Sequence, residues 1–350
     1  MTPPAHRPPA RRTGGGPRAR LLTRVLLVLV LLGGGLAAAG CSNDGGGSGS
    51  GSGRGAGSGA GSGAGPVRTT PGHRAGGGAG AGGGGGGGRT AERAHYPTYV
   101  ALGDSYTAAP FVPQTVLGNS CLRSSNNYPT LVAARLPGTH LVDVSCSGAD
   151  TGSMVRVQRT GNGNEPPQFD ALTRGTDLVT VGIGGNDFNL FGTLVGTCTQ
   201  LRASDPTGSP CRDRFTAGGV DQLGNELSQV RARVAAVVAG IRQRAPHARV
   251  VVVGYPQIIP AHGTCPRRLP LATGDYPFAR RMNAGLAAAV NAGARRADAY
   301  VNVFRHSAGH DICSAHPWIN GSLTDTSRAL AYHPFAAEQA AVARLVLAAL

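Results

Sequence analysis

The chain has 350 residues with a formal net charge of +15, carried by 33 arginines without a single lysine. From residue 95 onward the basic residues number 22 against 16 acids, so this part is near +6. So small an excess does not indicate a nucleic-acid partner, and the lack of lysine excludes a P-loop nucleotide site.

The N-terminal segment 1–40 has the features of an export signal. Five arginines and no acid occur in residues 1–20, and a leucine- and valine-rich run from Leu21 to Leu32 follows. This run is too short for a comfortable membrane span, and small residues at 37–40 precede Cys41. The arrangement resembles a bacterial lipobox, in which Cys41 is lipidated and anchors the protein to the outer face of the membrane. The alternative is an ordinary signal peptide cut near Ala39, which gives an extracellular protein.

Residues 41–94 are mostly glycine, serine and alanine and cannot form a hydrophobic core. A flexible chain of about 50 such residues has a root-mean-square reach of roughly 40 Å. We therefore expect a disordered tether that separates the segment at Cys41 from a folded domain at 95–350.

The first predicted strand of that domain, Thr98–Leu102, ends at Gly103 and is followed at once by Asp104 and Ser105. A serine on a tight turn between a strand and a helix can act as a nucleophile, because the helix N-terminus offers unpaired N–H groups to a developing anion. The simpler alternative is that Ser105 only caps a helix.

Further strands and helices alternate along the domain, which predicts an α/β fold with a mostly parallel sheet between helical layers. Ligands of such sheets bind at the carboxyl ends of the strands, where Ser105 would lie. The predicted strands are His140–Val144, Asp177–Ile183, Arg249–Gly254 and Tyr300–Phe304, and the predicted helices are Asp221–Arg244, Pro277–Arg296 and Pro334–Leu350.

Polar residues follow two more strands, and a histidine precedes the last helix. Gly148 can supply a backbone N–H and Asn186 a side-chain N–H to an oxyanion, although a turn glycine and a helix cap are the ordinary interpretations. His333 comes directly before Pro334, which we expect at the first helical position. An imidazole held there could accept the proton of the serine.

Together these residues identify the chain as similar to the SGNH hydrolases, also called GDSL esterases and lipases, in their secreted, disulfide-bearing actinobacterial branch. The blocks GDSYTA, CSGAD, GGND and YHP occur in the family's order and span nearly the whole domain. The resemblance implies a flavodoxin-like three-layer α/β/α sandwich with about five parallel strands. It also implies that Ser105 is the nucleophile and His333 the base. The oxyanion hole would comprise the N–H groups of Ser105 and Gly148 and the side chain of Asn186.

The chain departs from the family pattern at the third catalytic position. Many members carry an acid three residues before the histidine, and Leu330 stands there. Two replacements are open: the Leu330 backbone carbonyl, which we favour, or the carboxylate of Asp325. Either would orient the imidazole, but only the carboxylate would add a charge that stabilises the imidazolium.

The cysteines fit an exported protein. If Cys41 is lipidated, six remain, and six allow 15 connectivities. The family resemblance implies the pairs Cys121–Cys146, Cys198–Cys211 and Cys265–Cys313. We expect no metal site, because exported thiols usually oxidise and no Cys-x-x-Cys spacing occurs.

These features predict a monomeric serine esterase or lipase that needs no cofactor and acts on lipid or glycan acyl esters. A carbohydrate acetyl esterase would use the same residues and differ in a strict acetyl preference. A non-catalytic module that binds the cell wall is the third alternative, and it would show no ester turnover. The sequence suggests pocket walls at Trp318, in the loop from Tyr255 to Pro270 and in the segment from Phe188 to Leu194, without fixing the acyl group.

Overall fold

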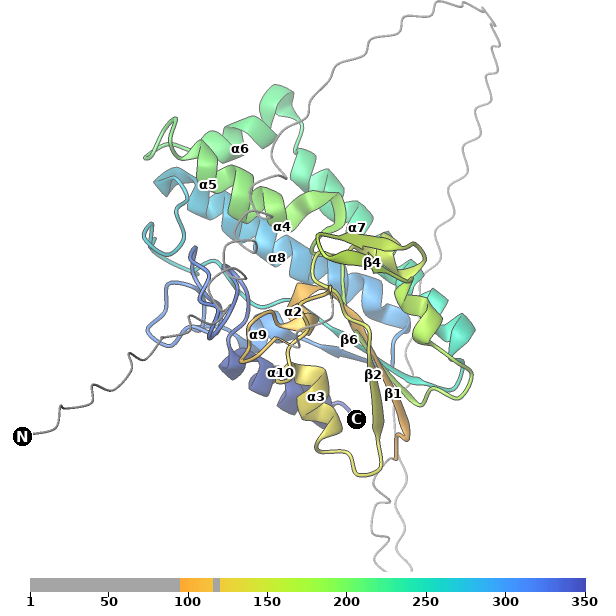
Figure 1. The fold of residues 1–350 in the computed structure, drawn as a ribbon. Helices are drawn as coiled ribbons and strands as arrows, with labels where there is room; N and C mark the ends of the chain where they lie inside the picture. Colours follow the sequence, from red (N-terminus) through yellow and green to blue (C-terminus); the bar gives the residue numbers. More distant parts are fainter. Residues whose placement is uncertain (1–94, 116–119) are drawn as a thin grey trace, which may run out of the picture. The chain divides into compact units, whose positions relative to one another are not determined.

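The computed structural model describes residues 95–115 and 120–350 (Figure 1). The predicted signal segment, the tether and Cys41 lie outside the described residues. Five parallel strands form the main sheet in the order β2-β1-β5-β6-β7. Their bounds are β1 Thr98–Gly103, β2 His140–Asp143, β5 Leu178–Gly182, β6 Arg249–Val253 and β7 Ala299–Val301.

Helices cover both faces of this sheet (Figure 1). Alternate strand residues point to opposite faces, so Val100 and Leu102 pack with α7 and α8, whereas Tyr99 and Ala101 pack with α3 and α10. The two apolar clusters confirm the predicted three-layer α/β/α sandwich. The four covering helices are α3 Tyr128–Ala133, α7 Gln222–Arg244, α8 Tyr276–Gly293 and α10 Ala336–Ala348.

Two predicted boundaries are wrong near the C-terminus. The last strand ends at Val301, because the Asn302 side chain accepts the Arg305 N–H and begins helix α9, Val303–His306. Helix α10 begins at Ala336 with Phe335 as its N-cap, while Pro334 instead forms an isolated bridge with Ile319. His333 therefore lies in a bend between a turn and this bridge, three residues ahead of the helix.

The parallel register brings the carboxyl ends of the central strands together. Gly103 at the end of β1 is paired with Gly182 at the end of β5, and β2 flanks β1 on its other side. The short helix α2, Ser105–Ala108, starts one residue beyond β1. Segments that follow β1, β2 and β5 consequently lie at one edge of the sheet.

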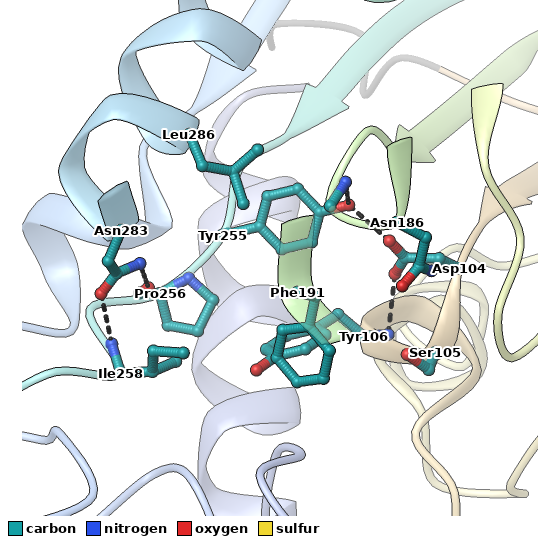
Figure 2. A pocket seen from close by; sticks show the side chains of 11 residues that line it. Asp104, Ser105, Tyr106, Asn186, Phe191, Tyr255, Pro256, Ile258, Asn283 and Leu286 are labelled. Atoms are coloured by element: carbon teal, nitrogen blue, oxygen red, sulfur yellow. Dashed lines mark hydrogen bonds between the residues drawn. The ribbon is translucent and has the colours of Figure 1, made fainter. Parts of the chain in front are cut away.

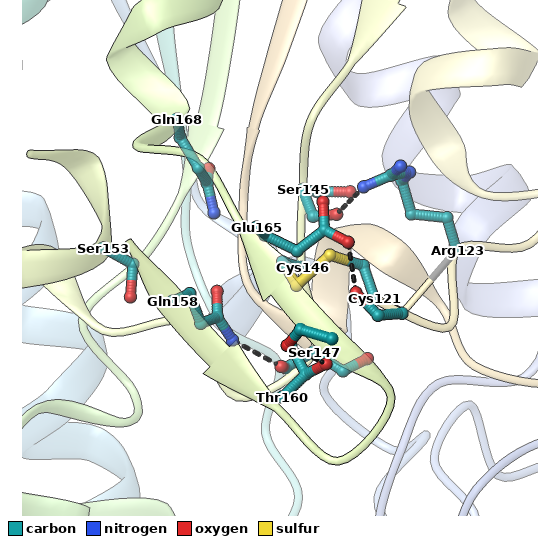
Figure 3. Close-up of a disulfide and its surroundings, with 12 residues drawn as sticks. Cys121, Arg123, Ser145, Cys146, Ser147, Ser153, Gln158, Thr160, Glu165 and Gln168 are labelled. Carbon is teal, nitrogen blue, oxygen red and sulfur yellow. Dashed lines mark hydrogen bonds between the residues drawn. A yellow bond between two sulfur atoms is a disulfide. The ribbon is translucent and has the colours of Figure 1, made fainter. Parts of the chain in front are cut away.

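Three disulfides hold the loops of the described domain: Cys121–Cys146, Cys198–Cys211 and Cys265–Cys313. These are the pairs that the family resemblance implies. The first lies beside the hairpin of β3, Gln158–Thr160, and β4, Gly163–Glu165, where the Gln158 amide donates to the Ser147 carbonyl at 2.8 Å (Figure 3). The bridge and the hairpin thus fix the chain immediately before Gly148.

The remaining elements are short. They are β3 Gln158–Thr160, β4 Gly163–Glu165, α4 Leu190–Gly192, a π-helical turn Thr193–Thr197, α5 Cys198–Leu201, α6 Pro210–Phe215 and the 3₁₀ turns Thr151–Met154, Gln168–Ala171, Asp187–Asn189, Ala217–Gly219, Thr273–Asp275 and Ala294–Arg296. None of the helices in the described part of the chain is long and apolar enough to cross a membrane.

Candidate active site

Ser105 lies on a sharp turn between β1 and α2. Asp104 is the N-cap of the helix, since its carboxylate accepts the Tyr106 N–H at 2.9 Å, so the interpretation of Ser105 as the cap is wrong. Gly103 allows the turn because a Cβ there would come within 2.3 Å of the Thr107 hydroxyl. Ser105 is the first helical residue, and it is buried with 6% of its surface exposed.

Two backbone N–H groups beside this serine have no acceptor. Within residues 95–115 and 120–350, no carbonyl or side chain accepts the N–H of Ser105 or of Gly148. Gly148 has a φ of +80°, a conformation that glycine adopts at little cost. The Asn186 amide nitrogen donates one hydrogen to the Ala149 carbonyl at 2.8 Å and keeps a second. The three predicted oxyanion donors thus belong to the segments that follow three adjacent strands.

Asp187 holds two of these segments together. Its buried carboxylate accepts the Thr151 N–H and the Thr151 hydroxyl, both at 2.8 Å, and Arg233 lies 3.5 Å away. Burial raises the pKa of Asp187, and these contacts partly oppose the shift. Phe188 and Asn189 follow in left-handed conformations, with φ of 55° and 57°. Such strain in non-glycine residues is often found at functional sites.

His333 is buried with its ring held by a main-chain carbonyl. Its Nδ1 donates to the Ala331 carbonyl at 2.7 Å, and this bond leaves Nε2 without a proton and able to act as a base. The ring contacts Tyr106 and Phe191, at centroid distances of 5.4 and 5.5 Å. Burial lowers the pKa of His333 from 6.5 to about 4. The imidazole is therefore neutral at pH 7.

Neither acceptor predicted for His333 receives its ring proton. The Leu330 carbonyl accepts the backbone N–H of His333 at 3.1 Å instead of the ring N–H. Asp325 is partly exposed and accepts the N–H and the hydroxyl of Ser327, which lowers its pKa. The Ala331 carbonyl therefore occupies the position that the sequence assigned to Leu330 or Asp325.

Contacts around Tyr106 place the histidine loop against the serine turn. The Tyr106 hydroxyl donates to the Tyr332 carbonyl at 2.8 Å, and the Gln339 amide donates to the Tyr106 carbonyl at 3.0 Å. The Ser105 hydroxyl and the His333 ring make no hydrogen bond with each other in these described segments. Catalytic hydrogen bonds of this kind are often long before substrate binds.

A small pocket opens beside Ser105 (Figure 2). Four of its eleven lining residues come from two of the three segments proposed as walls from the sequence. Trp318, the third, does not line the cavity and stacks on His310 at a centroid distance of 4.5 Å. The lining residues are Asp104, Ser105, Tyr106, Gly185, Asn186, Phe191, Tyr255, Pro256, Ile258, Asn283 and Leu286.

Two buried carboxyl groups near the serine turn were not predicted. Burial raises the pKa of Asp104 to about 7 and that of Glu338 to about 8. Asp104 accepts a hydrogen bond from the Tyr255 hydroxyl, and Glu338 accepts one from the Gln339 side-chain amide. The sequence did not reveal these contacts. Tyr255 is 151 positions from Asp104, and Glu338 becomes buried only when the chain folds.

Comparison with known proteins places these residues in a family. The sequence model of the GDSL-like lipase/acylhydrolase family matches residues 101–341, which include all four predicted site residues. The chain belongs to this family. Lipase 2 of Streptomyces coelicolor is 44% identical to this GDSL-family chain over 225 residues, covering 62% of the chain and 73% of that relative. A Streptomyces rimosus lipase is 33% identical over 256 residues, covering 71% and 84%.

Two solved structures share the fold of this chain. An extracellular lipase from Streptomyces rimosus superposes with a TM-score of 0.59 at 30% identity, covering 72% of this chain and 99% of that one. A phospholipase A1 from Streptomyces albidoflavus gives a TM-score of 0.60 at 28% identity, covering 73% and all of that chain. The predicted family and fold are confirmed.

Proposed function

We propose that this chain is an exported serine esterase or lipase that cleaves carboxylic acyl esters through an acyl-serine intermediate. Ester hydrolysis follows from membership of the GDSL family and from relatives named lipase and esterase. Export is supported by the three disulfides and by the likeness to an extracellular lipase. The observation that carries the proposal is the pair of N–H groups without acceptors at Ser105 and Gly148, together with a neutral His333 whose ring contacts Tyr106.

The first half-reaction transfers the acyl group to Ser105. The Ser105 hydroxyl oxygen attacks the ester carbonyl carbon while His333 Nε2 takes the hydroxyl proton. The negative oxygen accepts hydrogen bonds from the Ser105 N–H, the Gly148 N–H and the Asn186 amide. When the C–O bond to the alcohol breaks, the leaving oxygen takes the proton from Nε2, and His333 is neutral again.

The second half-reaction returns the enzyme to its starting state. Water attacks the acyl carbon, and His333 Nε2 accepts one of its protons. Collapse of this second intermediate breaks the bond to Ser105, whose oxygen recovers the proton from Nε2. Throughout, the Nδ1–H remains bonded to the Ala331 carbonyl, which keeps the ring in one orientation. The chain's own residues supply every group that these steps require.

The cavity favours a lipid acyl chain over an acetyl group. Most of the side chains that line it are apolar or aromatic, a surface that suits a hydrocarbon chain better than the single methyl of an acetyl group. We therefore propose that the acyl chain enters between Phe191, Tyr255 and Leu286. A carbohydrate acetyl esterase would leave most of this apolar surface unused.

A panel of p-nitrophenyl esters from acetate to palmitate tests the proposal. We expect kcat/KM to rise beyond acetate and Ser105→Ala to lose about 10⁴-fold or more in kcat. Ser209→Ala is the matched control, since Ser209 is similarly buried at 8% exposure and lies outside the cavity. Persistent turnover by Ser105→Ala would exclude this nucleophile. Strict acetyl preference would favour the glycan esterase, and no turnover of any ester would favour the binding module.

We also propose that the exported chain acts as a monomer tethered to the membrane through a lipidated Cys41. The small residues before Cys41 and the glycine-rich segment after it support this arrangement. Mass spectrometry of the mature N-terminus should find a diacylglyceryl cysteine, and Cys41→Ala should release the enzyme into the medium. A mature chain that starts elsewhere would contradict the anchor. Light scattering of the released enzyme checks the monomer.

A further inference from the structure

The Tyr255 hydroxyl connects the nucleophile turn to the oxyanion segment. Tyr255 follows β6 by two residues, and its hydroxyl accepts the Gly185 N–H at 2.8 Å. The same hydroxyl donates to Asp104, whose other carboxylate oxygen accepts the Tyr106 N–H at 2.9 Å. One continuous row of hydrogen bonds therefore runs from Gly185 through Tyr255 and Asp104 to Tyr106 (Figure 2).

Each end of this row is one residue from a proposed oxyanion donor. Gly185 precedes Asn186, and Ser105 lies between Asp104 and Tyr106. All four groups in the row are backbone N–H groups or buried side chains, so their separations vary little. The row consequently fixes the distance between the Ser105 N–H and the Asn186 side chain.

The surroundings leave the Tyr255 ring little freedom. Its ring packs edge-on against Tyr106 at a centroid distance of 5.5 Å. A Cβ at Gly185 would lie 2.9 Å from the Tyr255 ring, so the glycine is what allows the ring to approach. The ring also lines the cavity beside Ser105. Its hydroxyl and its ring therefore contact different parts of the site.

We propose that Tyr255 is a positioning residue whose hydroxyl aligns the Ser105 and Asn186 donors on one oxyanion, a role that rests on the proposed function. Catalytic donors lose much of their effect when they move by about 1 Å. Removal of the hydroxyl leaves a buried Gly185 N–H without an acceptor and Asp104 Oδ2 without its donor. The bond from the Asp104 N–H to the Gly182 carbonyl at 3.1 Å still joins the two strand ends, but the loop at Gly185 and the serine turn lose their side-chain connection.

The consequence is a selective loss in the chemical step. Tyr255→Phe keeps the ring that lines the acyl cavity, so KM should stay within about twofold of the parent. The order of preference along the ester panel should not change. The oxyanion forms only during reaction, so kcat should fall by about 10- to 100-fold. Titration of active sites with a fluorophosphonate gives kcat per competent molecule.

Tyr276→Phe is a matched control for simple loss of stability. The Tyr276 hydroxyl also accepts a backbone N–H, from Cys265 at 3.0 Å, and donates to an oxygen, the Leu269 carbonyl at 2.6 Å. It is buried and lies outside the cavity. We expect both variants to lower Tm similarly, with only Tyr255→Phe losing kcat. Equal kcat in Tyr255→Phe and the parent would overturn the proposal, and so would equal kcat losses in the two variants.

A double-mutant cycle tests the connection through Asp104. In Asp104→Asn the new amide can keep its oxygen on the Tyr106 N–H, but its nitrogen only donates and cannot accept the Tyr255 hydroxyl proton that Asp104 accepts in the parent. Tyr255→Phe should then cost less than threefold in the Asp104→Asn background, against 10- to 100-fold in the parent. Independent, multiplying losses would contradict the row. If turnover by the parent enzyme requires Ser105, the proposed function stands whichever result the double-mutant cycle gives. The two proposals can therefore fail separately.

Discussion

Lowering the pH from 8 to 5 tests how His333 is held. Burial lowers its pKa from 6.5 to about 4, and the Ala331 carbonyl opposes the shift only in part. With that pKa about nine-tenths of the rings are neutral at pH 5, whereas about 3% would be neutral with a pKa of 6.5. Because kcat/KM reports the ionisation of the free enzyme, most of it should survive at pH 5, against an approximately 30-fold loss for an unperturbed base.

The assay follows a short-chain p-nitrophenyl ester between pH 4 and 8, with samples quenched in alkali so that the released phenolate absorbs. Two other buried groups near the serine turn titrate in or next to this range, Asp104 with a pKa of about 7 and Glu338 with a pKa of about 8. The profile is therefore repeated in Asp104→Asn and Glu338→Gln, and full recovery at pH 7.5 excludes unfolding. An acid limb centred near 6.5 in all three proteins would refute the reasoning.

Three further substitutions test other parts of the site. Asp325→Ala should change kcat by less than twofold, because this carboxylate binds Ser327 and not His333. A loss near 10⁴-fold in the ester assay would make it a triad member. Glu338→Gln should raise the unfolding free energy in urea by up to about 5 kcal/mol at pH 9 and hardly at pH 4. The pKa of Glu338 is about 8 in the folded chain and 4.5 in the unfolded chain, so the parent loses stability as the pH rises from 4.5 to 8. Equal effects of the substitution at pH 4 and pH 9 would contradict this. Gly148→Ala should lower kcat by about 10- to 1000-fold, since φ of +80° disfavours a Cβ although the nearest atom would be 3.7 Å away; unchanged kcat would remove this donor.

The positions of Ser105, Gly148 and Asn186 were predictable because each lies within five residues of the end of a strand. Parallel strands place their carboxyl ends at one edge, so local sequence was enough to bring these residues to the same side of the sheet. Their closeness within that edge required the strand order β2-β1-β5, which sets the three strands next to each other. Long-range pairing decides this order, and the sequence analysis did not specify it.

The acceptor of the His333 ring proton could not be read from the sequence. Ala331 reaches the ring because Tyr332, between the two, adopts a left-handed φ of 61°. A bulky aromatic residue rarely takes this conformation, and no local pattern predicts it. The loop holds it there, since the Tyr332 N–H donates to the Gly321 carbonyl and its carbonyl accepts the Tyr106 hydroxyl. The contact of Tyr255 with Asp104 escaped prediction for the same reason, as it joins residues 151 positions apart.

A carbonyl behind His333 changes where the proposed mechanism must find its stabilisation. The Ala331 dipole orients the imidazole but adds no full negative charge, so the imidazolium formed in the transition state is stabilised less than beside a carboxylate. The barrier must then be lowered mainly at the oxyanion, in a buried site where each N–H donor is effective. Gly148→Ala should therefore cost far more than Asp325→Ala. The same reasoning applies to Tyr255 and Asp104, which are buried beside the serine turn. Burial raises the pKa of the Asp104 carboxyl and lowers the stability of the fold. We expect the alignment of the oxyanion donors to contribute more to catalysis than this loss of stability costs.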